Sequence, residues 1–197
     1  MIFPESGCAL FYCDVAGCRG KDLLDDLTEG QKRYLERDIT AKRREEYIFS
    51  RSLYNRVVYE FLGGIPVDAF PERAPHAPLS VGADTFFTSL SHSGTLMAVA
   101  VARCPVSVDA EKQQPRDFVA LGERVAPQLN LGIMSPETRA RSFYRAWCEK
   151  ECAIKLGEKA PDFFSYAWEL STPSGIYTIA VAQRAPFPIP TFYQIEK

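Results

Sequence analysis

The sequence predicts an α+β fold made of two similar halves. The same order of elements (a strand, a long helix and an antiparallel hairpin) occurs twice along the chain. The strand sequence VAVA at 99–102 has a counterpart in IAVA at 179–182, and 197 residues are enough for two small units. We expect these halves to cover residues 1–103 and 104–197 and to pack as an intramolecular pseudo-dimer. Their junction is the natural place for a ligand.

Local signals set the boundaries of the first half. Thr40 is suited to cap a long amphipathic helix that Gly63-Gly64 ends. The proline-rich stretch 66–78 is expected to form an ordered loop. The remaining elements are a strand over 9–15, one or two short helices within 21–36, and two strands over 86–90 and 96–103 joined by a turn at 91–94.

The second half repeats this order. Ser135 and Pro136 occupy the cap and the first position of a long helix that ends near Leu156. The other expected elements are a strand over 106–111, a helix over 117–125, a hairpin of strands 163–170 and 176–183, and a final strand over 191–195.

Composition and charge exclude several classes of function. The net charge of −2 does not favour non-specific nucleic-acid binding, so we expect no nucleic-acid partner. Residues 1–17 lack the positive start of a signal peptide, and the apolar run 96–102 is too short to span a membrane. We therefore expect a cytoplasmic protein without membrane contact. Cys148 and Cys152 are spaced for metal binding, but structural zinc needs four such ligands, so we interpret them as buried free thiols.

The predicted strand over 106–111 carries two carboxylates on one face. Side chains alternate along a strand, so Ser107, Asp109 and Glu111 share one face and the apolar residues between them share the other. Two carboxylates at this spacing lie roughly 7 Å apart, close enough to bind one hard cation through oxygen atoms. A solvated polar strand face is the alternative explanation.

The second long helix carries a stripe of functional residues. Phe143, Trp147, Glu151 and Lys155 follow one another at steps of four residues and so share one side of the helix. The aromatic residues indicate that this side faces the interior. Glu151 would then lie in a partly buried cleft, where a carboxylate needs a metal ion or an amine. The alternative is an exposed ion pair between Glu151 and Lys155.

Further polar residues suit an anionic ligand. Ser91-His92-Ser93-Gly94 offers hydroxyl donors and an imidazole that can carry positive charge, as phosphate requires. The same residues are also typical of a plain turn. Arg44 and Arg51 lie seven positions apart on one face of the first long helix, so they could meet one extended anion.

Taken together, these motifs resemble those of the 4′-phosphopantetheinyl transferase superfamily. Residues 106–111 (VSVDAE) are similar to the pattern G-V/I-D-x-E, and residues 143–155 (FYRAWCEKECAIK) are similar to the pattern F-x-x-W-x-x-K-E-x-x-x-K. The Ser-His-Ser before them also resembles a motif of the family. The length and the duplicated organisation are similar to the pseudo-dimeric, surfactin-synthetase-activating branch, and the resemblance covers about residues 43–155.

The resemblance implies transfer of the 4′-phosphopantetheine arm of coenzyme A to a serine of an apo-acyl or peptidyl carrier protein, with release of 3′,5′-ADP. It implies that Asp109, Glu111 and Glu151 bind Mg²⁺ or Mn²⁺. Glu151 would accept the proton of the serine, and Lys155 would stabilise or protonate the leaving 3′,5′-ADP. The residues implied to hold the nucleotide phosphates are Arg44, Arg51, Ser91, His92 and Lys155. We expect the protein to be a monomer.

The chain departs from the family pattern at three places. Ser107 stands where the family usually has glycine, and Cys148 where it usually has serine or threonine. His76-Ala77-Pro78 replaces a frequent Gly-Lys-Pro, so one phosphate contact is missing or comes from Arg73 or His76. We expect Ser107 to narrow the approach of the pyrophosphate. None of these changes removes a carboxylate, so we expect an active enzyme.

Two other classes fit part of the pattern. A metal-dependent nuclease or phosphodiesterase also uses acids and a lysine, but in many nucleases these lie two residues apart on a strand, whereas Glu151 and Lys155 lie four apart on a helix. A non-catalytic relative would bind coenzyme A or a carrier protein without turnover. The departures at Ser107 and Ala77 favour that alternative.

Overall fold

The computed structural model describes residues 7–63, 78–157 and 163–196. It is a mixed fold of helices and two β-sheets, which confirms the predicted α+β class. The elements up to residue 102 are β1 (Cys8–Asp14), the 3₁₀ helix η1 (Gly20–Asp26), α1 (Glu29–Tyr34), α2 (Ala41–Arg56), its π-helical continuation η2 (Val57–Phe61), β2 (Pro78–Val81), β3 (Asp84–Ser93) and β4 (Leu96–Ala102). They are followed by β5 (Val106–Lys112), α3 (Phe118–Val125), the short 3₁₀ helix η3 (Leu131–Ile133), α4 (Pro136–Leu156), β6 (Phe164–Thr172), β7 (Gly175–Gln183) and β8 (Thr191–Gln194).

The two sheets contain the same strand arrangement. One sheet has the order β2-β3-β4-β1-β8 and the other has the order β5-β7-β6. In both, a hairpin (β3-β4 or β6-β7) pairs antiparallel with the strand that precedes it in the sequence (β1 or β5). The long helices α2 and α4 each lie between that strand and the hairpin in the sequence. The order β1-β4-β3 is therefore repeated as β5-β7-β6.

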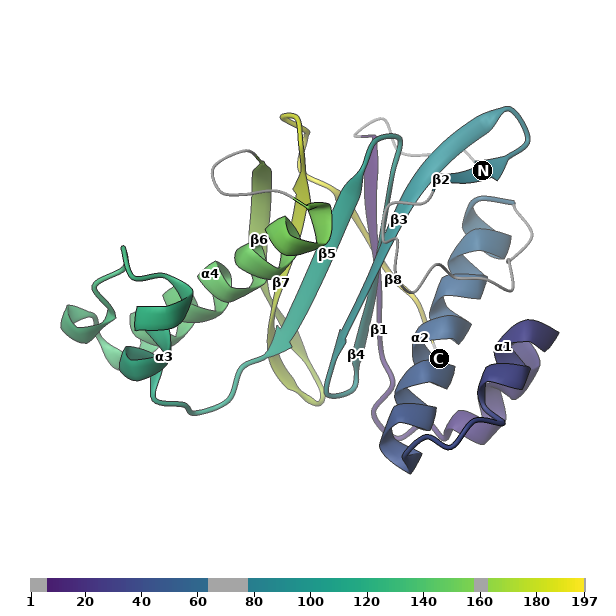
Figure 1. The fold of residues 1–197 in the computed structure, drawn as a ribbon, viewed down its shortest axis with the longest axis horizontal. Coiled ribbons are helices and arrows are strands. Elements are labelled where there is room, and N and C mark those ends of the chain that lie inside the picture. The colour runs from purple at the N-terminus through teal and green to yellow at the C-terminus, as the bar shows by residue number, and fades with distance from the viewer. Residues whose placement is uncertain (1–6, 64–77, 158–162, 197) are drawn as a thin grey trace.

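The sheets pack against each other, and a long helix covers each outer face (Figure 1). Strand alternation explains this layering. On β1, Leu10 packs toward the three-stranded sheet, whereas Ala9 and Phe11 pack toward α2. The core between the sheets is made largely of small and β-branched residues, which allow the two faces to approach closely.

Caps and a glycine position the two long helices. Oγ1 of Thr40 accepts a hydrogen bond from the backbone N–H of Arg43 at 3.2 Å, as the sequence predicts. Oγ of Ser135 accepts from the N–H of Thr138 at 3.3 Å, with Pro136 in the first turn. α4 ends at Gly157, whose φ of 69° is the left-handed conformation that glycine adopts readily.

The predicted turn at 91–94 is wrong. Strand β3 continues through Ser93, and the turn follows at Gly94, which has a φ of 55°. The serines stay in the strand because their side chains hydrogen-bond to a neighbouring strand, β5. Serine next to glycine is a common turn signal, and here that signal marked the turn too early.

Two strands were placed incompletely by the sequence. β2 (78–81) was not predicted, and it pairs with β3; the rest of the proline-rich stretch, 66–77, lies outside the described residues. β8 (191–194) forms as expected, but it pairs in parallel with β1. The last strand of the chain therefore belongs to the sheet of the first half, and the division at residue 103 stays a prediction. None of the described helices is long and apolar enough to cross a membrane.

Candidate functional site

The predicted alternation along β5 is confirmed. Val108 and Ala110 are buried in the core between the two sheets. Asp109, between them, points to the opposite face, where it meets α4. This face is where the sequence predicts the two strand carboxylates.

Lys155 and Asp109 join α4 to β5. Nζ of Lys155 donates to Oδ1 of Asp109 at 2.8 Å and to the backbone oxygen of Val108 at 2.7 Å. The side chains retain only 25% and 9% of their exposure, so water screens this ion pair weakly. The Lys155 side chain is therefore partly buried, with its ammonium group held against the strand, and its place in a cleft stays a prediction.

The two carboxylate oxygens of Asp109 have different surroundings. Oδ1 accepts from Lys155 and also from the hydroxyl of Ser91 at 3.0 Å. Oδ2 is buried and finds no hydrogen-bond partner among the described residues. A buried carboxylate oxygen without a donor is unfavourable unless a cation or a proton satisfies it. This atom is thus suited to bind a metal ion.

Glu111 lies in the field of the other two acids. Burial raises the pKa of its carboxyl group, and the negative charges of Asp109 and Glu151 raise it further. The hydroxyl of Ser93, which donates to Oε2 at 3.1 Å, and the charge of Arg116 act in the opposite direction. The charge of Glu151 on α4 therefore acts on the Glu111 carboxyl group of β5.

The three acids do not yet surround a metal position. In the residues described, no group of three or more His, Cys, Asp or Glu side chains is arranged so that it could hold a metal ion. The convergence of Asp109, Glu111 and Glu151 on one cation therefore stays a prediction.

His92 faces the other way from the serines that flank it. Burial lowers the pKa of its imidazole; the charge of Glu46 raises it, and the charges of Arg43, Lys155 and Arg51 lower it. These charges come from α2 and from α4. His92 therefore lies where the two long helices approach the same strand.

An aromatic stack supports the arginine closest to the core. Arg51 is buried, and its guanidinium carbon lies 4.8 Å from the centroid of the Tyr47 ring. Tyr47 stacks on Tyr34 at 4.2 Å between centroids, and Arg37 lies 4.7 Å above Tyr34. Such stacks restrict a guanidinium group to one orientation.

From the sequence, Arg43 and Glu46 are expected only to form a surface ion pair with each other. Arg43 and Glu46 act on the His92 imidazole, and Arg44, which the motif comparison suggested, does not appear among those charges. Arg44 is half-buried on α2, and its contact with a phosphate stays a prediction. A signal was available, because Arg43 and Glu46 are three residues apart and so lie on one side of the helix.

The cysteines of α4 pack as apolar residues. The thiols of Cys148 and Cys152 donate to the backbone oxygens of Thr178 and Ala180 on β7, at 3.6 and 3.4 Å. Burial raises the pKa of Cys152 to about 12, so it remains a neutral thiol at physiological pH. Ser107 is also fully buried, on the face of β5 that α4 covers. It has no exposed surface with which to narrow the approach of a pyrophosphate. Arg73, His76 and Ala77 lie outside the described residues.

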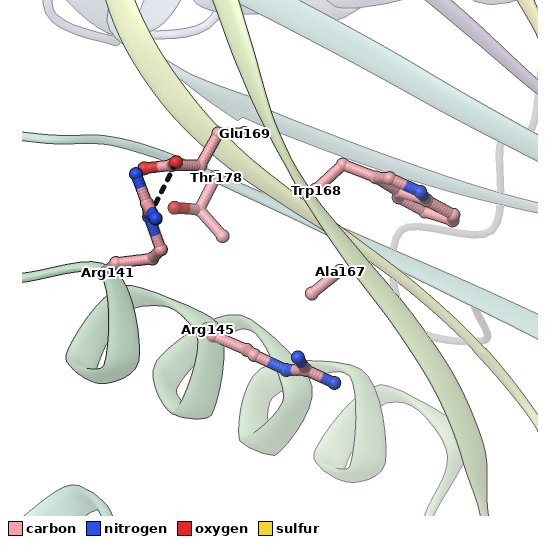
Figure 2. A pocket seen from close by; sticks show the side chains of 6 residues that line it. All are labelled: Arg141, Arg145, Ala167, Trp168, Glu169 and Thr178. Atoms are coloured by element: carbon pink, nitrogen blue, oxygen red, sulfur yellow. Dashed lines mark ion pairs between the residues drawn. The ribbon is translucent and has the colours of Figure 1, made fainter. Parts of the chain in front are cut away.

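A separate cleft of about 200 Å³ lies between α4 and β6 (Figure 2). Glu169 accepts from Arg141, with an Nε–Oε2 distance of 2.7 Å, and from Gln113 at 2.7 Å, while Arg145 pairs with Glu149 at 3.1 Å. Its positive charges are thus balanced by neighbouring acids, and we assign it no ligand. The cleft borders β6, whereas Asp109 and Glu111 lie on β5, at the other edge of the sheet. Its lining residues are Arg141, Arg145, Ala167, Trp168, Glu169 and Thr178.

No protein-family model matches the chain, and no curated protein matches it. The interpretation of the site therefore rests on its residues and their geometry.

Proposed function

We propose that the protein transfers the 4′-phosphopantetheine arm of coenzyme A to a serine of an apo-acyl or peptidyl carrier protein and releases 3′,5′-ADP. The observation that carries this proposal is the meeting of the two sequence motifs. Lys155, from the second motif, is bonded to Asp109, from the first. Glu111 of the first motif lies in the field of Glu151 of the second.

The fold supports the same proposal. The repeated order β1-β4-β3 and β5-β7-β6, each with a long helix, is what a pseudo-dimer of two similar halves requires. The candidate site includes side chains from both repeats, since His92 lies on β3 and the acids lie on β5 and α4. We therefore propose the pseudo-dimeric 4′-phosphopantetheinyl transferase arrangement for this chain.

The residues fit a divalent cation. Asp109, Glu111 and Glu151 would hold Mg²⁺ or Mn²⁺, which prefer carboxylate oxygens. The buried Oδ2 of Asp109 supports this assignment, because among the described residues nothing else satisfies it. The cation would neutralise charge on the pyrophosphate of coenzyme A.

The reaction is a phosphoryl transfer in which one bond replaces another. The oxygen of the carrier serine would bond to the phosphorus that bears pantetheine, and the bond from that phosphorus to the bridging oxygen of 3′,5′-ADP would break. Glu151 would take the proton of the serine hydroxyl. Lys155 would stabilise negative charge near Asp109 and on the leaving group. The residues proposed to orient the phosphates of coenzyme A are Arg44, Arg51 and His92. The hydroxyl proton of Ser91 is used on Asp109 instead.

The test is incubation of the protein with coenzyme A, Mg²⁺ and a panel of apo-carrier proteins, followed by intact-mass spectrometry. We expect one carrier or more to gain the mass of one phosphopantetheine arm, and a chelator to prevent the gain. Release of 3′,5′-ADP without any carrier would instead indicate a phosphodiesterase. Coenzyme A binding without transfer to any carrier would indicate a protein that only binds.

A further inference from the structure

Three serines on β3 contact β5 at regular intervals. Oγ of Ser89 accepts a hydrogen bond from the backbone N–H of Val108 at 3.1 Å. Oγ of Ser91 accepts from the backbone N–H of Ala110 at 3.2 Å, and Oγ of Ser93 accepts from the backbone N–H of Lys112 at 3.0 Å. In each of the three pairs, the two residues are 19 positions apart in the sequence. We call Ser89, Ser91 and Ser93 the serine ladder.

The serine ladder satisfies an edge of the three-stranded sheet. β5 is an edge strand of that sheet and pairs only with β7 among its described strands. The N–H groups on its other edge would otherwise lack partners, and buried N–H groups without partners are unfavourable. β3 brings its serine side chains to this edge, because its residues alternate between β5 and α2. The ladder therefore connects a strand of the first half to a strand of the second.

Two members of the ladder also contact the candidate metal ligands. The hydroxyl of Ser91 donates to Oδ1 of Asp109 at 3.0 Å, and the hydroxyl of Ser93 donates to Oε2 of Glu111 at 3.1 Å. A serine hydroxyl has one proton to donate and two lone pairs that accept. Each of these serines thus donates its single proton to a carboxylate. Its oxygen also accepts a hydrogen bond from the backbone N–H of the residue that follows that carboxylate in β5.

Ser89 provides an internal comparison. It makes the same contact with a backbone N–H, but the position that corresponds to the carboxylates is occupied by Ser107. All three serines are buried or half-buried in the same strand. Ser89 therefore shares the structural role of the ladder without the contact to an acid.

We propose that Ser91 and Ser93 are positioning residues that orient Asp109 and Glu111 for a divalent cation, so that the first half of the chain sets the cation affinity of ligands that all lie in the second half. This inference rests on the cation site of the proposed function. Each hydrogen bond fixes one carboxylate oxygen and leaves the other directed toward the cation. Hydrogen-bond partners of metal ligands typically change metal affinity by about 10- to 100-fold when they are removed. Ser91 thereby has a role other than the phosphate contact that the motif suggested.

The experiment measures Mn²⁺ binding to the full chain by water-proton relaxation, without coenzyme A or carrier. We expect Ser91→Ala and Ser93→Ala each to weaken Mn²⁺ binding by roughly 10-fold or more. Ser93→Thr, which keeps the hydroxyl group, should restore binding to within about 3-fold, since the proton donor is retained. Ser89→Ala should leave Mn²⁺ affinity within about 2-fold of the wild type, because its partner is only a backbone N–H.

Urea unfolding separates positioning from a loss of structure. Each alanine variant removes the hydrogen bond from a backbone N–H of β5, and Ser91→Ala and Ser93→Ala also remove the bond to a carboxylate. We therefore expect all three variants to unfold at a lower urea concentration than the wild type, with the smallest shift in Ser89→Ala. Equal Mn²⁺ affinities in the wild type and the Ser91 and Ser93 variants would overturn the proposal while the cation site stands. Equal weakening by all three serines would overturn it in favour of a purely structural ladder. A wild-type protein that binds no Mn²⁺ would overturn both this proposal and the cation site.

Discussion

Lys155 on α4 holds Asp109 on β5 by an Nζ–Oδ1 contact of 2.8 Å, although 46 residues separate them in the sequence. This ion pair fixes the helix that carries Glu151 against the strand that carries the other two acids. Asp109 is almost fully buried, and a nearby positive charge offsets the cost of burying its carboxylate. The ion pair therefore relates the stability of the fold to the electrostatics of the candidate site.

Replacement of Lys155 by alanine should affect both the stability of the fold and the rate of transfer. Loss of one partner of a largely buried ion pair leaves the other charge uncompensated, so we expect a loss of roughly 3 kcal/mol in the free energy of unfolding. Transfer should slow, but less than in Glu151→Gln, because the cation would still neutralise part of the leaving-group charge. Urea unfolding and single-turnover transfer measure the two effects. A Lys155→Ala protein with unchanged stability would show that the ion pair has no energetic role.

His92 should act on the affinity for coenzyme A. We expect His92→Ala to raise the KM for coenzyme A more than it lowers kcat, because the proposed partner is a phosphate remote from the reacting bond. A variant with the wild-type KM and a reduced kcat would require a different role.

The pH dependence gives an independent test of His92. Burial lowers the pKa of its imidazole below the usual 6.5, so the free protein at neutral pH carries it mainly uncharged. A phosphate binds the protonated form better. Affinity for coenzyme A should therefore rise as the pH falls toward this lowered pKa and level off below it, and His92→Gln should lose that rise. Titration calorimetry between pH 5 and 8 measures the affinity of both proteins for coenzyme A. Wild-type affinity that does not change with pH would contradict this role of His92.

Asp14 should stabilise the contact between the two hairpins. Its carboxylate accepts from the hydroxyls of Thr95 and Ser174, at 2.7 Å each, and these residues belong to the two hairpin regions. Burial acts to raise the pKa of Asp14, but hydrogen bonds from these side chains and from the N–H of Ala16 outweigh it and hold the pKa well below its usual value. Asp14→Asn should lower the free energy of unfolding at pH 7 by about 2 kcal/mol, since it loses charge-assisted hydrogen bonds.

The sign of the acid dependence follows from that lowered pKa. An aspartate with a depressed pKa in the folded state stabilises the fold above its unfolded pKa of about 3.9, and that contribution is lost as the pH falls toward the folded-state pKa. The stability of the wild type should therefore decrease more steeply below pH 4 than that of Asp14→Asn. Parallel stability curves for the two proteins, measured by urea unfolding from pH 7 to pH 2, would contradict this role.

The parts of the fold that depend on local signals were predictable. Ser135 and Pro136 place the start of α4 correctly, and alternation along β5 assigns Asp109 to the correct face. Contacts between segments that are distant in the sequence were not predictable. No local pattern indicates that β8 pairs with β1, and the turn expected at 91–94 was wrong because the serines find partners 19 residues away.

The same distinction applies to the candidate site. Helical spacing predicts that Glu151 and Lys155 share one side of α4, and the structure has both half-buried. It could not predict that Lys155 is bonded to Asp109 or that Arg43 and Glu46 act on His92. These relationships depend on how α2 and α4 pack, which a single sequence does not specify.

We propose that Glu151 accepts the serine proton and binds the cation, and Glu151→Gln removes both capacities at once. Glutamine keeps the shape of the side chain but has neither its charge nor its basicity, so both cation binding and proton removal should fail. The matched control is Glu137→Gln on the same helix, since the Glu137 side chain is 85% exposed. The measurement is single-turnover pantetheinylation of an apo-carrier, with circular dichroism to verify folding. We expect Glu151→Gln to lose at least about 100-fold in rate, as for loss of a general base, while Glu137→Gln retains the wild-type rate. A folded Glu151→Gln protein that transfers at nearly the wild-type rate would contradict the account.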